Sequence, residues 1–224
     1  MKELMRLIVL VTGFIPYLLV YKPRIYYEEG NKRSNRLKGG ALIVSNHYLF
    51  MDYPMTMFHW FGRRVHCVML EYVFEFSWFL KLSAEIIGGI SADRESKGMS
   101  FIDKSEKLIK KGRLVQIYPE AHNTPDGKIH DFKPSYVLIA LRAGAPIVPF
   151  IIDGNYGVFK RAHAIIGKPI MLSDFCPSPD PTREEIEDLN RMVREKAIEL
   201  KETLDAKTKK RSRQRSFEHN LRKE

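Results

Sequence analysis

Short apolar runs alternate along this chain with amphipathic stretches. Four runs rich in β-branched and other apolar residues, each bounded by residues that break strands, have the composition of buried strands: 41–45, 65–70, 114–118 and 147–152. Between them, apolar residues recur at helical spacing over 100–111 and 135–143, and each of these stretches ends at a glycine. This alternation predicts an α/β layered fold with a mixed, largely parallel sheet flanked by helices.

The chain begins with an apolar segment over residues 1–21. Its uncharged stretch, 7–20, has fourteen residues, whereas a membrane span needs about 20. Lys2 and Arg6 precede the apolar run, as in a signal peptide, but no small-x-small cleavage site follows it. We therefore expect a retained helix, kinked near Pro16, that lies in one membrane leaflet or packs on the fold; a true span is the alternative.

A second long helix is predicted near the C-terminus. Thr182 and Glu185 have the spacing of a capping box, and apolar residues then recur at helical spacing as far as Leu204. This pattern predicts a C-terminal amphipathic helix. Beyond residue 206 the apolar periodicity ends, so the expected organisation is an apolar N-terminal helix at 1–21, one domain at 22–206 and a basic solvated tail at 207–224.

The composition is that of a globular protein, with 44% hydrophobic and 29% charged residues among 224. A disordered chain and a polytopic membrane protein are thereby excluded. The net charge of +10 lies at the two ends: residues 1–40 hold eight Lys and Arg against three Glu, and residues 207–224 hold eight against two. Basic ends fit anionic membrane lipids or nucleic acid, but a body with a net charge of −1 argues against nucleic acid.

The two cysteines, Cys67 and Cys176, stand in unrelated local contexts, and neither has the spacing of a metal-ligand pair. We expect no disulfide framework and no metal site, and a reducing compartment is the simplest interpretation.

His47 and Asp52 follow the first predicted strand directly, at the end where α/β folds build their sites. Five residues apart, the two side chains point in different directions on a regular helix and to opposite faces of a strand. They can touch only if the segment turns between them. In contact, Asp52 would orient the imidazole and leave its other nitrogen as a general base toward a hydroxyl.

Three further blocks follow this pair in order, and together they carry a family resemblance. The segment NHYLFMD resembles the His-x4-Asp block of the glycerolipid acyltransferases typified by bacterial 1-acylglycerol-3-phosphate acyltransferases. The later blocks of that family are Gly with apolar residues ending in Asp-Arg, then Phe-Pro-Glu-Gly-Thr-Arg, then apolar-Pro-x-Val-Pro. Residues 88–94, 118–120 and 145–150 resemble them.

The resemblance implies an enzyme that moves a fatty acyl group from an acyl thioester to the hydroxyl of a glycerolipid, most simply 1-acylglycerol-3-phosphate. His47 would be the base and Asp52 its partner, and no metal or cofactor is implied beyond acyl-CoA or acyl carrier protein as co-substrate. Arg94 and Glu120 by resemblance, and Lys133 by proximity, are candidate substrate-binding residues. Residues 121–123, Ala-His-Asn, depart from the family's Gly-Thr-Arg, so an acceptor other than lysophosphatidate stays open.

We also expect attachment to the cytoplasmic face of a membrane, with anionic lipids as partners of the basic ends. An aromatic run at 72–79 fits core and lipid-facing packing, and an acyl groove is the alternative. A non-catalytic lipid-binding protein on the same fold is the competing function, but such a protein would be expected to lose the His47 and Asp52 pair.

Overall fold

The computed structural model describes residues 2–31, 37–92, 99–124, 126–176 and 181–221. Its strands are β1 (Arg24–Tyr27), β2 (Ala41–Val44), β3 (Val65–Leu70), β4 (Gly89–Ala92), β5 (Leu114–Ile117), β6 (Ile147–Ile152) and β7 (His163–Ile166). Its α-helices are α1 (Lys2–Tyr21), α2 (Tyr53–His59), α3 (Tyr72–Glu75), α4 (Trp78–Ile87), α5 (Met99–Lys110), α6 (Ser135–Ala143) and α7 (Arg183–Leu221). Two short 3-10 helices cover Phe50–Asp52 and Leu172–Asp174.

The strands form one seven-stranded sheet in the order β1-β7-β6-β2-β5-β3-β4. Every neighbouring pair is parallel except β6 and β7, which are antiparallel. The mixed, largely parallel sheet predicted from the sequence is therefore confirmed, and the four predicted strands are β2, β3, β5 and β6. In a parallel sheet the carboxyl ends of neighbouring strands meet at one edge, so the segments that follow β2, β5 and β6 lie close together.

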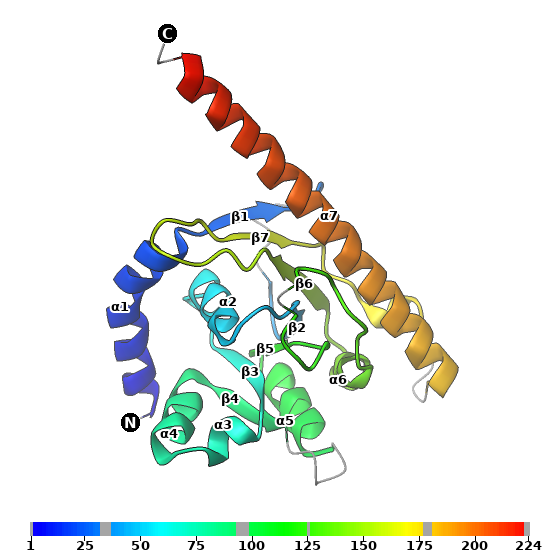
Figure 1. The fold of residues 1–224 in the computed structure, drawn as a ribbon. Helices are drawn as coiled ribbons and strands as arrows, with labels where there is room; N and C mark the ends of the chain where they lie inside the picture. Colours follow the sequence, from blue (N-terminus) through cyan, green and yellow to red (C-terminus); the bar gives the residue numbers. More distant parts are fainter. Residues whose placement is uncertain (1, 32–36, 93–98, 125, 177–180, 222–224) are drawn as a thin grey trace.

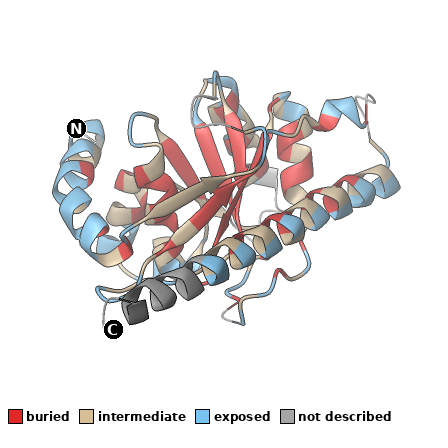
Figure 2. Ribbon diagram, turned by 90° about the horizontal axis from the view of Figure 1, so that it is seen from above, coloured by how far each residue is buried: buried red, intermediate tan, exposed pale blue. Residues whose placement is uncertain are grey.

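Helices cover both faces of the sheet (Figure 1). Along β2, alternate side chains enter different cores: Leu42 and Val44 join the core beneath α6 and α7, while Ala41 and Ile43 join the core beneath α1 and α2. All six residues of β6 are buried, as expected of a strand covered on both faces. The burial view shows this red central sheet between the outer helices (Figure 2).

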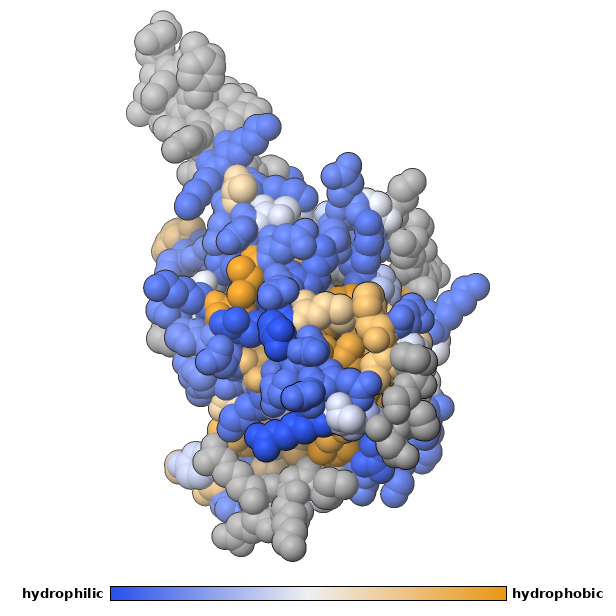
Figure 3. Space-filling view, turned by 90° about the vertical axis from the view of Figure 1, so that its right-hand side faces the viewer, coloured by the Kyte–Doolittle hydropathy of each residue, from blue (hydrophilic) through white to orange (hydrophobic). Residues whose placement is uncertain are grey.

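Helix α1 passes through Pro16 without ending and keeps most of its apolar surface exposed. Leu10, Tyr17 and Tyr21 are buried against the fold, whereas Ile8 is 52% exposed and Ile15 is 67% exposed. Among the described residues it is the one helix long and apolar enough to cross a membrane. The face of the molecule turned away from α1 is mainly hydrophilic (Figure 3).

Helix α7 begins at the predicted cap, where the Thr182 backbone N–H donates to Glu185 Oε2 (2.7 Å) and the Glu185 N–H donates to Thr182 Oγ1 (3.2 Å). It does not end where the apolar periodicity ends. The backbone continues in helical form to Leu221, so the segment expected as a solvated tail belongs largely to the helix. Residues 207–221 contain no Gly or Pro, and Lys, Arg and Gln sustain a helix even without apolar contacts.

The aromatic run at 72–79 forms α3 and the start of α4, in the connection between β3 and β4. These side chains do not join the core. Tyr72 and Phe76 are each 63% exposed, Trp78 is 78% exposed and Phe79 is 62% exposed. Helix α4 packs beside α1, so two elements with exposed apolar side chains are neighbours.

Candidate active site

The segment that carries His47 is anchored before it leaves the sheet. After β2, the Ser45 N–H donates to the Ile117 carbonyl of β5 (3.2 Å). The Asn46 side chain then spans to β6, accepting from the Ile152 N–H (2.9 Å) and donating to the Ile152 carbonyl (3.1 Å). Because Asn46 is buried and binds two backbone groups, His47 leaves the carboxyl edge of the sheet in a fixed direction.

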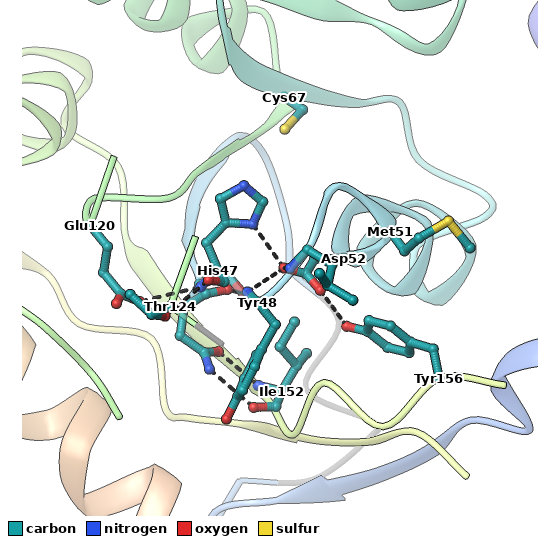
Figure 4. Close-up of polar contacts among 12 residues, drawn as sticks. His47, Tyr48, Met51, Asp52, Cys67, Glu120, Thr124, Ile152 and Tyr156 are labelled. Carbon is teal, nitrogen blue, oxygen red and sulfur yellow. Dashed lines mark hydrogen bonds and ion pairs between the residues drawn. The ribbon is translucent and has the colours of Figure 1, made fainter. Parts of the chain in front are cut away.

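The chain turns between His47 and Asp52, as the spacing requires. Asp52 Oδ2 accepts hydrogen bonds from the backbone N–H groups of Tyr48 (2.6 Å) and Leu49 (2.9 Å). The same oxygen lies 2.8 Å from His47 Nδ1. The predicted contact is therefore present in the structure, and the carboxylate that meets the imidazole also holds the turn (Figure 4).

Asp52 is fully buried and receives a fourth hydrogen bond from outside its own loop. The Tyr156 hydroxyl donates to Asp52 Oδ1 (2.6 Å). Burial and the neighbouring Asp52 charge raise the pKa of Tyr156, so its phenol keeps the proton that it donates. Four donors thus surround one carboxylate with no exposed side-chain surface, and this compensates for its burial.

The surroundings of His47 define which of its nitrogens carries the proton. Asp52 Oδ2 can only accept, so Nδ1 donates and Nε2 of the neutral ring keeps its lone pair. The ring stacks on Tyr118, with centroids 4.1 Å apart. The His47 side chain is 21% exposed, in contrast to its buried partner. The arrangement therefore presents a basic nitrogen on a ring that is held in position from two sides.

Glu120 lies beside this pair but is occupied by the protein itself. Its Oε1 accepts from the His47 backbone N–H (3.2 Å) and its Oε2 accepts from the His130 N–H (3.2 Å). It is 1% exposed, and burial raises the pKa of its carboxyl group. We expected Glu120 to bind substrate by resemblance. The structure shows both oxygens of this carboxylate accepting from backbone N–H groups, one of them on the His47 loop, and the substrate-binding role stays a prediction.

In the third block, where residues 121–123 differ from the family's Gly-Thr-Arg, the backbone conformation of residue 121 explains why the family has glycine at that position. Ala121, which stands where the family has Gly, adopts a φ of +58°, a left-handed conformation that costs a non-glycine residue about 1–2 kcal/mol. Asn123, which stands where the family has Arg, is exposed.

A glycine on the β6–β7 connection supports the site from the other side. Gly154 has a φ of +69°, and a Cβ there would lie 2.6 Å from the Tyr48 ring. The close approach of this loop to Tyr48 brings Tyr156 to Asp52. Both the positive φ and the lack of space for a Cβ therefore favour glycine at position 154.

Of the other two predicted substrate-binding residues, the structure describes only Lys133. Lys133 is exposed, and its backbone N–H donates to the Pro119 carbonyl (2.9 Å), which places it beside the third block. Arg94 lies outside the described residues.

Sequence reasoning did not assign roles to Tyr118, Tyr156 or Asn46. Asn46 and Tyr118 lie next to the motif residues His47 and Glu120, which was an available signal. Tyr156 comes from a distant loop with no motif, and only the fold brings it to Asp52.

Cys67 of β3 is labelled in the same close-up (Figure 4). It is 1% exposed, and burial together with the Asp52 charge raises the pKa of its thiol. A thiol kept protonated is a poor nucleophile. Cys67 and Cys176 are both free and buried. Within the described part of the chain, no group of three or more His, Cys, Asp and Glu could hold a metal ion.

A second His–Asp pair provides an internal comparison. His163 Nδ1 lies 2.7 Å from Asp153 Oδ2, but the Oδ1 of the same Asp153 accepts from the backbone N–H groups of Asn155 (3.1 Å) and His163 (2.9 Å). This pair closes the connection between β6 and β7. Contact between an imidazole and a carboxylate thus occurs three times among the described residues, because His130 Nε2 also lies 3.0 Å from Asp126 Oδ2 at an exposed position. Only the His47 pair has the His-x4-Asp spacing recognised in the sequence.

Known proteins resemble this chain in both sequence and fold. A 1-acyl-sn-glycerol-3-phosphate acyltransferase of Bacillus subtilis is 27% identical over 183 residues, which cover 78% of this chain and 88% of that protein. A probable 1-acyl-sn-glycerol-3-phosphate acyltransferase of Mycoplasma genitalium is 26% identical over 126 residues, covering 54% and 46% respectively.

The crystal structure of the 1-acyl-sn-glycerophosphate (LPA) acyltransferase from Thermotoga maritima has the same fold. It matches with a TM-score of 0.58 at 15% identity, over 89% of this chain and 97% of that one. The family model described as Acyltransferase matches residues 24–153, which contain β1 to β6 and both members of the His47–Asp52 pair. The chain therefore belongs to the acyltransferase family, as its four sequence blocks predicted.

Proposed function

We propose that this acyltransferase moves a fatty acyl group from a thioester to the free hydroxyl of 1-acylglycerol-3-phosphate, with His47 as the general base. The observation that carries the proposal is the 2.8 Å contact between His47 Nδ1 and the buried Asp52, which leaves Nε2 as an acceptor for a proton. The names of the relatives support the choice of acceptor.

The reaction needs one base and one activated carbonyl. His47 Nε2 takes the proton from the acceptor hydroxyl as its oxygen bonds to the thioester carbonyl carbon. The carbon–sulfur bond then breaks, and the departing thiolate receives the proton from the imidazolium. Asp52 stabilises the imidazolium between these steps because it stays beside Nδ1. Direct attack requires no acyl-enzyme, which agrees with the buried, protonated state of Cys67.

The thioester comes from acyl-CoA or from acyl carrier protein in this proposal. Both carry the acyl group in the same bond, so the chemistry at His47 is shared. The acceptor phosphate needs a cation, and Lys133 beside the third block and Arg94 are the candidates. A second acceptor class, a neutral or differently substituted lyso-lipid, is favoured by the exposed Asn123 where the family has arginine.

We further infer that the protein works on the cytoplasmic face of a membrane containing anionic lipids. Helix α1 supports this inference, because only 17% of its most apolar stretch, within Glu3–Tyr21, is buried against the rest of the protein. Exposed apolar side chains of this extent are stabilised when they enter an acyl-chain environment. Both substrates would then meet at the surface, since lyso-lipids partition into it.

The decisive experiment is His47→Ala, with His130→Ala in the exposed His130–Asp126 pair as the matched control. General base catalysis typically contributes 10²–10⁴-fold, so His47→Ala should lower turnover by at least about 100-fold, whereas His130→Ala should stay near wild type. Product phosphatidate is measured by mass spectrometry with purified protein, acyl-CoA and lysophosphatidate, and folding is checked by thermal unfolding. Retention of more than about a tenth of the wild-type rate by a folded His47→Ala variant would refute the mechanism.

A further inference from the structure

A basic pocket of about 690 Å³ lies between the edge strand β4 and helices α3, α4 and α5. Its lining does not include His47 or Asp52. Among the described residues that line it, one carboxylate, Glu85, stands against five permanent cations: Arg64, Lys81, Lys104, Lys107 and Lys111. A concave surface with this excess of positive charge attracts anions.

His66 indicates which functional groups a bound anion would carry. It also lines the pocket and is 8% exposed. Its Nδ1 lies 3.1 Å from the Gly88 carbonyl, which can only accept, so Nδ1 carries the proton and Nε2 is an acceptor. Burial, and then the charge of Arg64, lowers the pKa of His66 to about 4, which keeps the ring neutral.

Nε2 of His66 is buried and has no hydrogen-bond partner. A bare phosphate dianion offers no donor to it. A ligand that combines a phosphate with a hydroxyl would satisfy both the lysines and this nitrogen.

The pocket adjoins the apolar side of the molecule. Helix α4 contributes Lys81 and Glu85 to the pocket and packs beside α1. Arg64 forms an ion pair with Glu3 at the start of α1. We call the exposed apolar residues of α1 together with Tyr72, Phe76, Trp78 and Phe79 the apolar face. Tyr and Trp are enriched where proteins meet the headgroup level of a bilayer.

We propose that the basic pocket binds the headgroup of an anionic phospholipid in the membrane that the apolar face contacts. Lys104 and Lys107 would meet the phosphate, and His66 Nε2 would accept a hydrogen bond from a headgroup hydroxyl, as phosphatidylglycerol offers. The proposal rests on the membrane association inferred above and not on the acyl-transfer reaction. The bound lipid is a site-specific anchor, separate from the lipid that reacts.

The test measures binding of the full-length protein to vesicles of phosphatidylcholine alone and of phosphatidylcholine with one-fifth phosphatidylglycerol. The double variant Lys104→Gln/Lys107→Gln is compared with Lys209→Gln/Lys210→Gln, which removes the same charge from exposed positions on α7. A basic residue at an anionic surface changes binding by roughly fivefold, so the pocket variant should bind mixed vesicles about 25-fold more weakly. The α7 variant should bind nearly as wild type does.

Three further comparisons separate a specific lipid site from general charge attraction, from binding of a free phosphate ester and from binding that does not use His66. Equal losses in the two double variants would overturn the site, because general charge attraction would then account for binding. Tight calorimetric binding of soluble sn-glycerol 3-phosphate that is lost in Lys104→Gln/Lys107→Gln would overturn the lipid assignment in favour of a free phosphate ester. Phosphatidylmethanol has the same phosphodiester charge but no hydroxyl, and wild-type binding equal to that of phosphatidylglycerol would refute the role of His66.

Two readouts distinguish failure of this proposal from failure of the proposed function. Binding to phosphatidylcholine alone reports the apolar face without the pocket. Turnover of a short-chain, soluble lysophosphatidate in the absence of vesicles reports the His47 site, and the pocket variants should leave it unchanged.

Discussion

Replacing Asp52 with asparagine separates the charge of this carboxylate from its shape. The carbonyl oxygen of an asparagine can occupy the position of Oδ2, where the N–H groups of Tyr48 and Leu49 and His47 Nδ1 converge. Its amide NH2 then faces the Tyr156 hydroxyl, which can accept once its own hydrogen rotates away. Because two backbone donors favour this orientation, the turn and the His47 tautomer should both survive Asp52→Asn.

The expected loss is that of an anion beside a developing cation. Unit charges about 4 Å apart interact by about 4 kcal/mol at an effective dielectric constant near 20, which corresponds to roughly 10³-fold in rate. The Asp52 side chain is fully buried and lies 2.8 Å from His47 Nδ1, so solvent screens the interaction little. An asparagine still accepts the hydrogen bond, and we therefore expect kcat to fall by about 10²–10³-fold with KM unchanged.

The assay follows free thiol released from acyl-CoA at saturating lysophosphatidate, alongside thermal unfolding of each variant. Asp126→Asn in the exposed His130–Asp126 pair is the matched control and should keep the wild-type rate. Two results would refute the reasoning. A rate within threefold of wild type would show that the charge of Asp52 is not used. A fall in kcat of well over about 10³-fold would show that the tautomer is lost, and that the two backbone donors do not hold the asparagine as argued.

Three other predictions follow from particular contacts. Gly154→Ala should lower both activity and melting temperature. The control is Gly39→Ala: Gly39 has a φ of +77° and nothing within 4 Å of an added Cβ, so this variant should show only the cost of a left-handed conformation, about 1–2 kcal/mol. Equal effects of the two variants on both measurements would contradict the steric argument. Ile8→Lys with Ile15→Lys should weaken binding to phosphatidylcholine vesicles without changing the melting temperature, because both side chains are exposed; unchanged flotation with vesicles would exclude insertion of α1. Asn123→Arg should raise the preference for lysophosphatidate over monoacylglycerol about tenfold in paired kcat/KM measurements, since a guanidinium adds a bidentate phosphate contact; no change in preference would show that the acceptor phosphate lies elsewhere.

The sequence by itself determined the fold class and the central pair. Strands β2, β5 and β6 were predictable because they are buried on both faces, which requires continuous apolar runs. Strand β3 is buried over its first three residues, and its apolar run was recognisable as well. Helices α5 and α6 were predictable because each buries one face and ends at a glycine. His47 and Asp52 were recognisable because their spacing and the later blocks resemble a family.

Other elements carried no such pattern. Strands β1 and β4 are edge strands whose residues are mostly half-buried, so neither shows the continuous buried apolar run that marks β2 and β5. The extension of α7 to Leu221 was missed because periodicity reports packing, and this part of the helix is polar in sequence. The aromatic run also misled in part, since its composition suits a core and its position in a surface connection leaves it exposed.

Only the tertiary structure decided how the pair is held. Tyr156 lies 104 positions from Asp52, and it reaches the carboxylate because β6 stands next to β2 in the sheet and the loop after β6 folds back through Gly154. Glu120 comes from the segment after β5, the other neighbour of β2, and it accepts a hydrogen bond from the His47 backbone N–H. Local sequence specifies which residue types a segment offers, but a hydrogen bond between distant segments depends on strand order, and strand order is set by packing of the whole chain.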